Sequence, residues 1–223
     1  MFFPEKITLI RPQDKVLEIG PGSSPHLRSN AFLELSYNSV EDKLSQRGGV
    51  LNEGDFGGRP IYYYQGEAFP FKDNQFDYVI CSHVIEHVND PKNFMREVFR
   101  VGNGRGYIEY PLITYEYLYD FSVHLNFIKF DFPKNILSFL PKRETSFKEF
   151  SGVSAIFYKT LECGWNDLCV INKNLFFEGV EFNHPFVVQK ALDIERLLPP
   201  KSLVSEKNVA RKFLDRVANK LGI

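Results

Sequence analysis

An apolar run that ends in two closely spaced glycines constrains this chain more than any other feature. Residues 15–25 read KVLEIGPGSSP. The apolar residues of the run can bury on both faces of a sheet, as a central parallel strand requires. Gly20 and Gly22 then break the strand, because they tolerate positive φ and let backbone N–H groups approach a ligand. The stretch therefore predicts the first strand of an open α/β sheet, with a ligand at its carboxyl edge.

An acidic residue, Glu18, stands near the carboxyl end of this predicted strand. The dinucleotide fingerprint has a third glycine where this chain has Pro25, and a carboxylate at Glu18 would repel a pyrophosphate. A carboxylate instead suits a ligand that has an ammonium group. S-adenosylmethionine has an ammonium, a ribose and an adenine, and no phosphate. The turn therefore favours S-adenosylmethionine over a dinucleotide.

A second informative stretch spans residues 66–91 and reads GEAFPFKDNQFDYVICSHVIEHVNDP. Residues 76–81 are dense in apolar and β-branched side chains, which predicts a buried central strand. Ser82 and His83 follow at its carboxyl end, beside the expected ligand. Pro91 opens a predicted helix that runs to residue 101 with apolar side chains at helical spacing.

Together the two stretches resemble the class I S-adenosylmethionine-dependent methyltransferases, and within them the methyltransferase type-11 family. The segments of residues 66–91 follow that family's order, from an acid–Ala pair to Ser–His–x–x–Glu–His–x–x–Asp–Pro, and the resemblance covers roughly residues 14–111. It implies an α/β fold with a Rossmann-like, mostly parallel sheet, an antiparallel closing strand and flanking helices, to which the residues after 111 add an aromatic-rich cap insertion. It also implies S-adenosyl-L-methionine as the cofactor.

The resemblance assigns roles to individual residues. By it, the methionine part of the cofactor would meet Glu18, Gly20 and Gly22. The ribose would meet Glu34, and the adenine would meet Glu67 and Ala68. Ser82 and His83 would line the site of methyl transfer.

The chain departs from the family pattern in the connection after the glycine turn. Residues 31–35 already form the next predicted strand, so no full crossover helix fits before it. Glu34 follows Gly20 by 14 residues, where the usual separation is about 20. These departures keep open a second hypothesis, a non-catalytic methyltransferase-like binding module.

A competing motif lies inside the second stretch. His83, Glu86 and His87 spell H-x-x-E-H, the inverted zinc-protease signature, in which two histidines on one helix share a zinc ion. That site needs both histidines inside a long helix, whereas a predicted strand ends two residues before His83. No third ligand stands out downstream, so we expect no metal and rank a zinc hydrolase last.

The second half of the chain reads as a cap and a closing segment. Residues 112–150 are crowded with aromatic side chains and predict a cap over an acceptor pocket. His124, within this cap, is a second candidate base in addition to His83. Residues 169–182 and 186–191 predict an antiparallel pair that closes the sheet. We expect residues 1–191 to form the methyltransferase domain. Residues 192–223 then form a linker and an amphipathic helix that could pair two copies as a homodimer.

Composition narrows the acceptor and the compartment. The net charge of −1 over 223 residues offers no field for nucleic acid, and three cysteines without a paired metal motif fit a reducing compartment. We expect a cytoplasmic protein with no membrane span and no nucleic-acid partner. The expected activity is methyl transfer to a small polar acceptor, most simply a hydroxyl of a sugar or other small metabolite.

Overall fold

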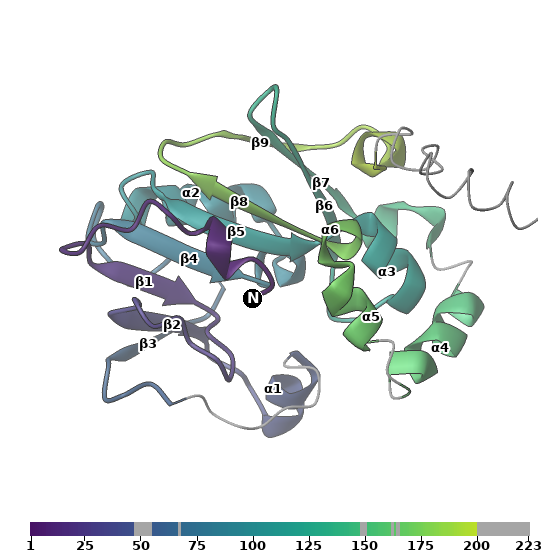
Figure 1. The fold of residues 1–223 in the computed structure, drawn as a ribbon, viewed down its shortest axis with the longest axis horizontal. Helices are drawn as coiled ribbons and strands as arrows, with labels where there is room; N and C mark the ends of the chain where they lie inside the picture. The colour runs from purple at the N-terminus through teal and green to yellow at the C-terminus, as the bar shows by residue number, and fades with distance from the viewer. Residues whose placement is uncertain (47–54, 67, 148–150, 162, 164–165, 200–223) are drawn as a thin grey trace, which may run out of the picture.

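A mostly parallel sheet of six strands forms the centre of the molecule (Figure 1). The computed structural model describes residues 1–46, 55–66, 68–147, 151–161, 163 and 166–199. The strand order is β3-β2-β1-β4-β5-β8, in which only β8 runs antiparallel to its neighbour. This confirms the predicted fold class. The strands are β1 (Val16–Ile19), β2 (Ala31–Leu35), β3 (Ile61–Tyr64), β4 (Tyr78–Ser82), β5 (Gly106–Pro111) and β8 (Phe177–Phe182).

The connections between the first strands contain little helical structure. Residues 20–30 form turns without a helix, which agrees with the truncated crossover seen in the sequence. After β2 comes α1 (Val40–Gln46), and after β4 come a 3-10 turn, η2 (Ile85–His87), and α2 (Pro91–Val101). Asp90 caps α2 by accepting a hydrogen bond from the backbone N–H of Asn93, and Pro91 occupies the first turn.

A second sheet of three strands packs beside the first. It contains β6 (Asn126–Asp131), β7 (Ile136–Pro141) and β9 (Val187–Lys190). β6 and β7 form an antiparallel hairpin, and β9 joins β7 in parallel. The predicted antiparallel pairing of residues 169–182 with residues 186–191 is therefore wrong. The turn at residues 183–185 carries the chain from one sheet to the other, and residues 169–176 are mostly helical.

Helices complete the cap beyond the tips of the parallel strands (Figure 1). They are α3 (Ile113–Tyr119), α4 (Ser151–Thr160), α5 (Asn166–Ile171) and α6 (Lys173–Phe176). Short 3-10 turns lie at η1 (Pro4–Lys6), η3 (Lys142–Glu144) and η6 (Ile194–Leu197). The predicted amphipathic helix within residues 200–223 lies outside the described residues, as do residues 148–150 of the predicted cap. No helix in the described residues is long and apolar enough to cross a membrane.

The two faces of the main sheet are covered differently. One face shares a continuous apolar core with α2 and with the inner side chains of β6, β7 and β9. The other face is covered by the N-terminal segment, whose Ile7 and Ile10 pack on Val16, Tyr78 and Tyr107. This segment lies over the sheet in place of a crossover helix.

The shared core predicts how the cap hairpin responds to mutation. Ile128 of β6 is fully buried in the same apolar cluster as the central strands. We expect Ile128→Ala to lower the free energy of unfolding by about 3 kcal/mol, because the truncation leaves a cavity. Urea unfolding followed by fluorescence and circular dichroism should still show one transition for the described core. Val187→Ala, at a mostly exposed position of β9, is the control. Two separate transitions would contradict a shared core.

Candidate functional site

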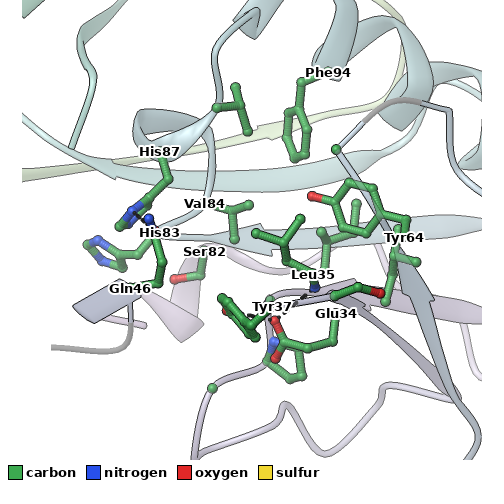
Figure 2. Close-up of a pocket in the computed structure, with 18 of the residues that line it drawn as sticks. Glu34, Leu35, Tyr37, Gln46, Tyr64, Ser82, His83, Val84, His87 and Phe94 are labelled. Atoms are coloured by element: carbon green, nitrogen blue, oxygen red, sulfur yellow. Dashed lines mark hydrogen bonds between the residues drawn. The ribbon is translucent and has the colours of Figure 1, made fainter. Parts of the chain in front are cut away.

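A cavity of about 850 Å³ opens at the carboxyl ends of β1, β2 and β4 (Figure 2). Its walls come from the glycine turn, from the end of β2 and from the turn after β4. This is the edge at which open α/β sheets bind ligands. The predicted site residues among those that line it are Glu18, Gly20, Gly22, Glu34, Ser82 and His83.

The glycine turn has the backbone conformation that its sequence predicts. Gly20 and Gly22 have φ values of 62° and 58°, in the left-handed region that favours glycine. A Cβ on Gly20 would lie 2.5 Å from Cγ2 of Val84, so the turn can approach the segment after β4 only without a side chain there. A Cβ on Gly22 would meet no atom within 4 Å, because this residue borders open space in the cavity.

Glu18 both lines the cavity and holds the turn together. Its Oε2 accepts hydrogen bonds from the backbone N–H of His26 at 2.8 Å and from the hydroxyl of Ser29 at 2.7 Å. Burial raises the pKa of the Glu18 carboxyl, and these two hydrogen bonds oppose the rise. Both bonds end on Oε2, so the described residues donate no hydrogen bond to Oε1.

The other acidic residues predicted to bind the cofactor differ in position. Glu34 is buried at the end of β2, where its Oε1 accepts a hydrogen bond from the hydroxyl of Tyr37 at 3.1 Å. Glu67 lies outside the described residues. Ala68 is exposed and is not among the described residues that line the cavity, although Gly66 is. The roles of Glu67 and Ala68 at the adenine stay predictions.

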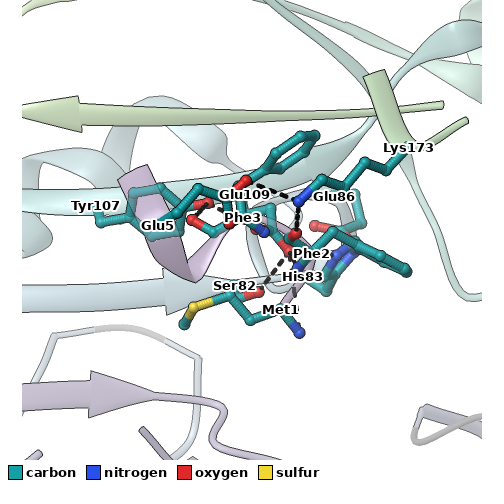
Figure 3. Close-up of polar contacts among 10 residues, drawn as sticks. All are labelled: Met1, Phe2, Phe3, Glu5, Ser82, His83, Glu86, Tyr107, Glu109 and Lys173. Carbon is teal, nitrogen blue, oxygen red and sulfur yellow. Dashed lines mark hydrogen bonds and ion pairs between the residues drawn. The ribbon is translucent and has the colours of Figure 1, made fainter. Parts of the chain in front are cut away.

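His83 lies between two buried carboxylates. Its Nε2 is 3.0 Å from Oε1 of Glu109, and its Nδ1 is 3.4 Å from Oε1 of Glu86 (Figure 3). Burial acts to lower the pKa of His83, but the two carboxylates outweigh it and raise the pKa to about 9. The imidazole is therefore a cation at neutral pH, with its Nε2–H hydrogen-bonded to Glu109 and its Nδ1 near Glu86 without a hydrogen bond. A protonated imidazole cannot accept another proton, so His83 in this form would orient Glu109 and Ser82 and not act as a base. Its predicted role as a base stays a prediction.

Glu109 is the residue that sequence reasoning missed. Its fully buried carboxylate accepts hydrogen bonds from the backbone N–H groups of Phe2 and Phe3 and from the side chains of Ser82 and Tyr107, besides facing His83 (Figure 3). Burial acts to raise its pKa, yet these donors and the His83 cation lower it to about 2. A single glutamate inside the apolar strand GYIEYP was the available sequence signal.

His124 comes from the cap and lines a second cavity of about 760 Å³. His83, His87 and Gln46 border both cavities, so the two adjoin. Aromatic side chains wall the second cavity: Phe2, Tyr115, Phe121, Tyr158 and Phe177. The structure thus brings His124 and His83, which are distant in the sequence, to one space.

The H-x-x-E-H segment does not form the helix that an inverted zinc-protease site needs. His83 has a left-handed φ of 56° and precedes the short 3-10 turn η2, so His83 and His87 do not stand one turn apart on an α-helix. Ligand-capable atoms do gather nearby in a different combination. One atom each from Glu86, His87 and His124 lies within 4.8 Å of the other two.

Comparison with protein families identifies the first half of the chain. Residues 17–109 match the family model described as a methyltransferase domain, Methyltransf_11. This segment is similar to type-11 methyltransferase domains. The matched segment begins in β1 and ends in β5 at Glu109, so the glycine turn, Glu34 and His83 fall inside it, whereas His124 lies beyond it.

Solved structures with a similar fold come from several organisms. YcgJ from Bacillus subtilis is 23% identical with a TM-score of 0.32, and the alignment covers 47% of each chain. A SAM-dependent methyltransferase from Thermotoga maritima is 23% identical with a TM-score of 0.33, over 48% of each chain. One from Methanosarcina mazei is 18% identical with a TM-score of 0.32, over 56% of this chain and 69% of that one. The chain spans about half the length of the first two. No curated protein matches the sequence.

The buried charge of Glu109 predicts that the stability of the fold depends on pH. We expect Glu109→Gln to lower the free energy of unfolding at pH 7 by about 3 kcal/mol, because it removes one partner of a buried ion pair. The folded pKa of about 2 lies below the usual value of 4.5, so the stabilisation is full above pH 4.5 and is lost as the pH falls toward 2.

Urea unfolding at pH 7 and at pH 3 measures this effect. The gap in stability between the wild type and Glu109→Gln should shrink at pH 3 to less than half of its value at pH 7. Glu195→Gln, at an exposed position in η6, is the control and should change little at either pH. An equal gap at both pH values would show that the charge of Glu109 does not stabilise the fold.

Proposed function

We propose that this protein binds S-adenosylmethionine in the cavity above β1, β2 and β4 and transfers its methyl group to a small polar acceptor. The observation that carries the proposal is the meeting of two adjoining cavities at His83, within the segment that matches the methyltransferase family model. The first cavity has glycines and carboxylates, and the second has aromatic walls. One suits a cofactor with an ammonium and a ribose, and the other suits an organic acceptor.

The residues present fit the cofactor. Gly22 leaves open space beside the turn, which a Cβ would begin to fill. The carboxylate of Glu18 faces the cavity close to the turn and can attract an ammonium group. Glu34 stands at the end of β2, and in nucleotide-binding folds an acidic residue at that position accepts hydrogen bonds from ribose hydroxyls.

Methyl transfer requires no covalent intermediate with the protein. The sulfonium of the cofactor supplies the methyl group and a good leaving group. The chain contributes by holding an acceptor in line with the methyl group and by excluding water with its aromatic walls. The proposed acceptor is a hydroxyl group of a sugar or other small metabolite. This hydroxyl must lose its proton during the transfer, which requires a base.

His124 is the better placed of the two candidate bases. Its Nδ1 faces Oε1 of Glu116 at 2.5 Å, which orients the ring. An oxygen partner on Nδ1 places the proton there and keeps Nε2 as the basic atom. His83, in contrast, has carboxylates beside both ring nitrogens.

Calorimetric titration with S-adenosylmethionine and S-adenosylhomocysteine tests the proposal, with NAD as a control ligand. We expect binding of the two adenosyl compounds only. Formation of S-adenosylhomocysteine in the presence of small hydroxylated metabolites then reports transfer. Binding of the cofactor without transfer to any acceptor class would favour the non-catalytic module, and the absence of binding in folded protein would refute the site.

Glu18→Gln tests the role of the carboxylate without removing the oxygen that holds the turn. The glutamine side chain can still accept from His26 and Ser29, but it has no charge for an ammonium group. We expect S-adenosylmethionine to bind the variant at least tenfold more weakly, which is about 1.4 kcal/mol.

The control ligand is 5′-methylthioadenosine, which has the adenosine part but no ammonium. Its affinity should be the same for the wild type and for Glu18→Gln. An equal loss for both ligands would assign Glu18 to the turn alone. Glu195→Gln serves as the variant that leaves both affinities unchanged.

A further inference from the structure

A buried carboxylate without hydrogen-bond donors lies next to His83 and His87, which border both cavities. The side chain of Glu86 is fully buried, and neither of its oxygens accepts a hydrogen bond from the described residues. The nearest cation, His83, holds its Nδ1 3.4 Å away and already binds Glu109 with its other nitrogen. Buried charges in proteins are paired, hydrogen-bonded or bound to metal ions. Glu86 therefore lacks a full partner.

Two histidines lie close to the same carboxylate. Nδ1 of His87 is 2.9 Å from Oε1 of Gln46, and Nδ1 of His124 is 2.5 Å from Oε1 of Glu116. Because both partners are oxygens, each Nδ1 carries the proton and each Nε2 is left as a potential ligand. Nε2 of His87 lies 3.8 Å from Oε1 of Glu86. The two imidazole rings are 4.6 Å apart and nearly perpendicular.

Backbone and side-chain hydrogen bonds fix the cap against this turn. The N–H of Leu125 donates to the carbonyl of Glu86 at 2.7 Å. The side-chain amide of Asn126 donates to the carbonyl of Val88, also at 2.7 Å. These bonds join the end of the cap segment that contains His124 to both sides of His87. The three side chains are thus positioned by the fold rather than by chance contact.

We propose that Glu86, His87 and His124 form a binding site for a divalent transition-metal ion. Two imidazoles and one carboxylate are an established donor set for zinc and related ions. Ligand atoms around a tetrahedral zinc lie about 3.4 Å apart, and these three lie within 4.8 Å of one another. Side-chain rotations that shorten these separations by up to about 1.4 Å complete the site.

The surroundings supply the remaining requirements of a metal site. Metal-binding histidines usually donate their second N–H to a carboxylate or a carbonyl oxygen. Glu116 and Gln46 take that part here. Ions can enter from solvent, because His87 borders both cavities and His124 borders the second. The sequence pattern H-x-x-E-H contributes Glu86 and His87, and the missing third ligand comes from the cap.

The ion's role deepens the proposed methyl transfer and rests on it. A metal at this wall would bind the acceptor hydroxyl and lower its pKa, so that the proton passes to water. The oxygen then forms a bond to the methyl carbon as the sulfur–carbon bond breaks, and the electron pair of that bond stays on sulfur. Nε2 of His124 cannot both bind a metal and accept a proton. The metal and the His124 base are therefore alternatives that experiment can separate.

Titration of chelator-treated protein with Co²⁺ tests the site directly. We expect visible d–d absorption that saturates at one ion per chain and disappears when Zn²⁺ is added. Proton NMR of the Co²⁺ form should show two exchangeable, paramagnetically shifted N–H signals, one for each Nδ1–H. Absence of the absorption, or shifted signals from other histidines, would overturn the site.

Variants separate the proposed ligands from other metal-binding groups. Glu86→Gln keeps the shape of the side chain and should weaken Co²⁺ binding at least 100-fold. Gln46→Ala, which removes only the partner of His87, should weaken it 10- to 100-fold. His184→Ala removes an exposed histidine outside the cluster and should leave the affinity unchanged. Unchanged binding in Glu86→Gln would refute the assignment.

Calorimetry of the same metal-free protein with S-adenosylmethionine distinguishes this proposal from the previous one. Cofactor binding without Co²⁺ binding would overturn the metal site and leave His124 as the base. Co²⁺ binding without cofactor binding would support the metal site and refute the proposed function.

Discussion

The buried charge of Glu109 is the interaction on which the candidate site depends. A carboxylate inside a sheet is costly unless donors surround it, and this one gathers them from three places: the N-terminal segment, the end of β4 and its own strand. Because Phe2 and Phe3 donate their backbone N–H groups to it, the N-terminal segment is anchored at the carboxyl edge of the sheet. The same segment covers the face that has no crossover helix. One charge therefore fixes both the cover of the sheet and the position of His83.

The cap is held by a second set of buried charges. Glu116 on α3 faces Nδ1 of His124 and also pairs with Lys142, whose Nζ lies 2.5 Å from Oε2 and 3.3 Å from an oxygen of Asp120. Each of these groups would be expensive to bury alone, so they specify how α3 meets the hairpin. Apolar packing alone would tolerate many arrangements of the cap's phenylalanines and tyrosines. The ion pairs select one, and it directs His124 toward His83 and His87.

The sequence predicted the parallel sheet well because its information there is local. Apolar runs end in glycine or polar residues at each carboxyl edge, and the family resemblance orders them. Pairing across long separations is not encoded in this way. Residues 186–191 (FVVQKA) read as a strand, but their sequence does not say which sheet the strand joins, and in the structure β9 pairs with β7. Glu109 was missed for a related reason, since its donors come from residues 2, 3, 82, 83 and 107. The position of Glu18, Glu34 and Ser82 at the cavity could be predicted because each stands near the carboxyl end of a predictable strand, and His83 directly follows β4.

The backbone at His83 explains why a familiar motif takes an unfamiliar shape. A φ of 56° is uncommon for a residue other than glycine and costs energy, and the hydrogen bond between Nε2 and Glu109 holds the ring in this position. A helix that began at His83 would place it in line with His87, as the inverted zinc-protease pattern demands. The left-handed residue instead turns His83 toward the sheet and directs Glu86 and His87 toward the cap. His83 thus contacts the sheet, whereas Glu86 and His87 lie near His124, a cap residue outside the segment that matches the family model.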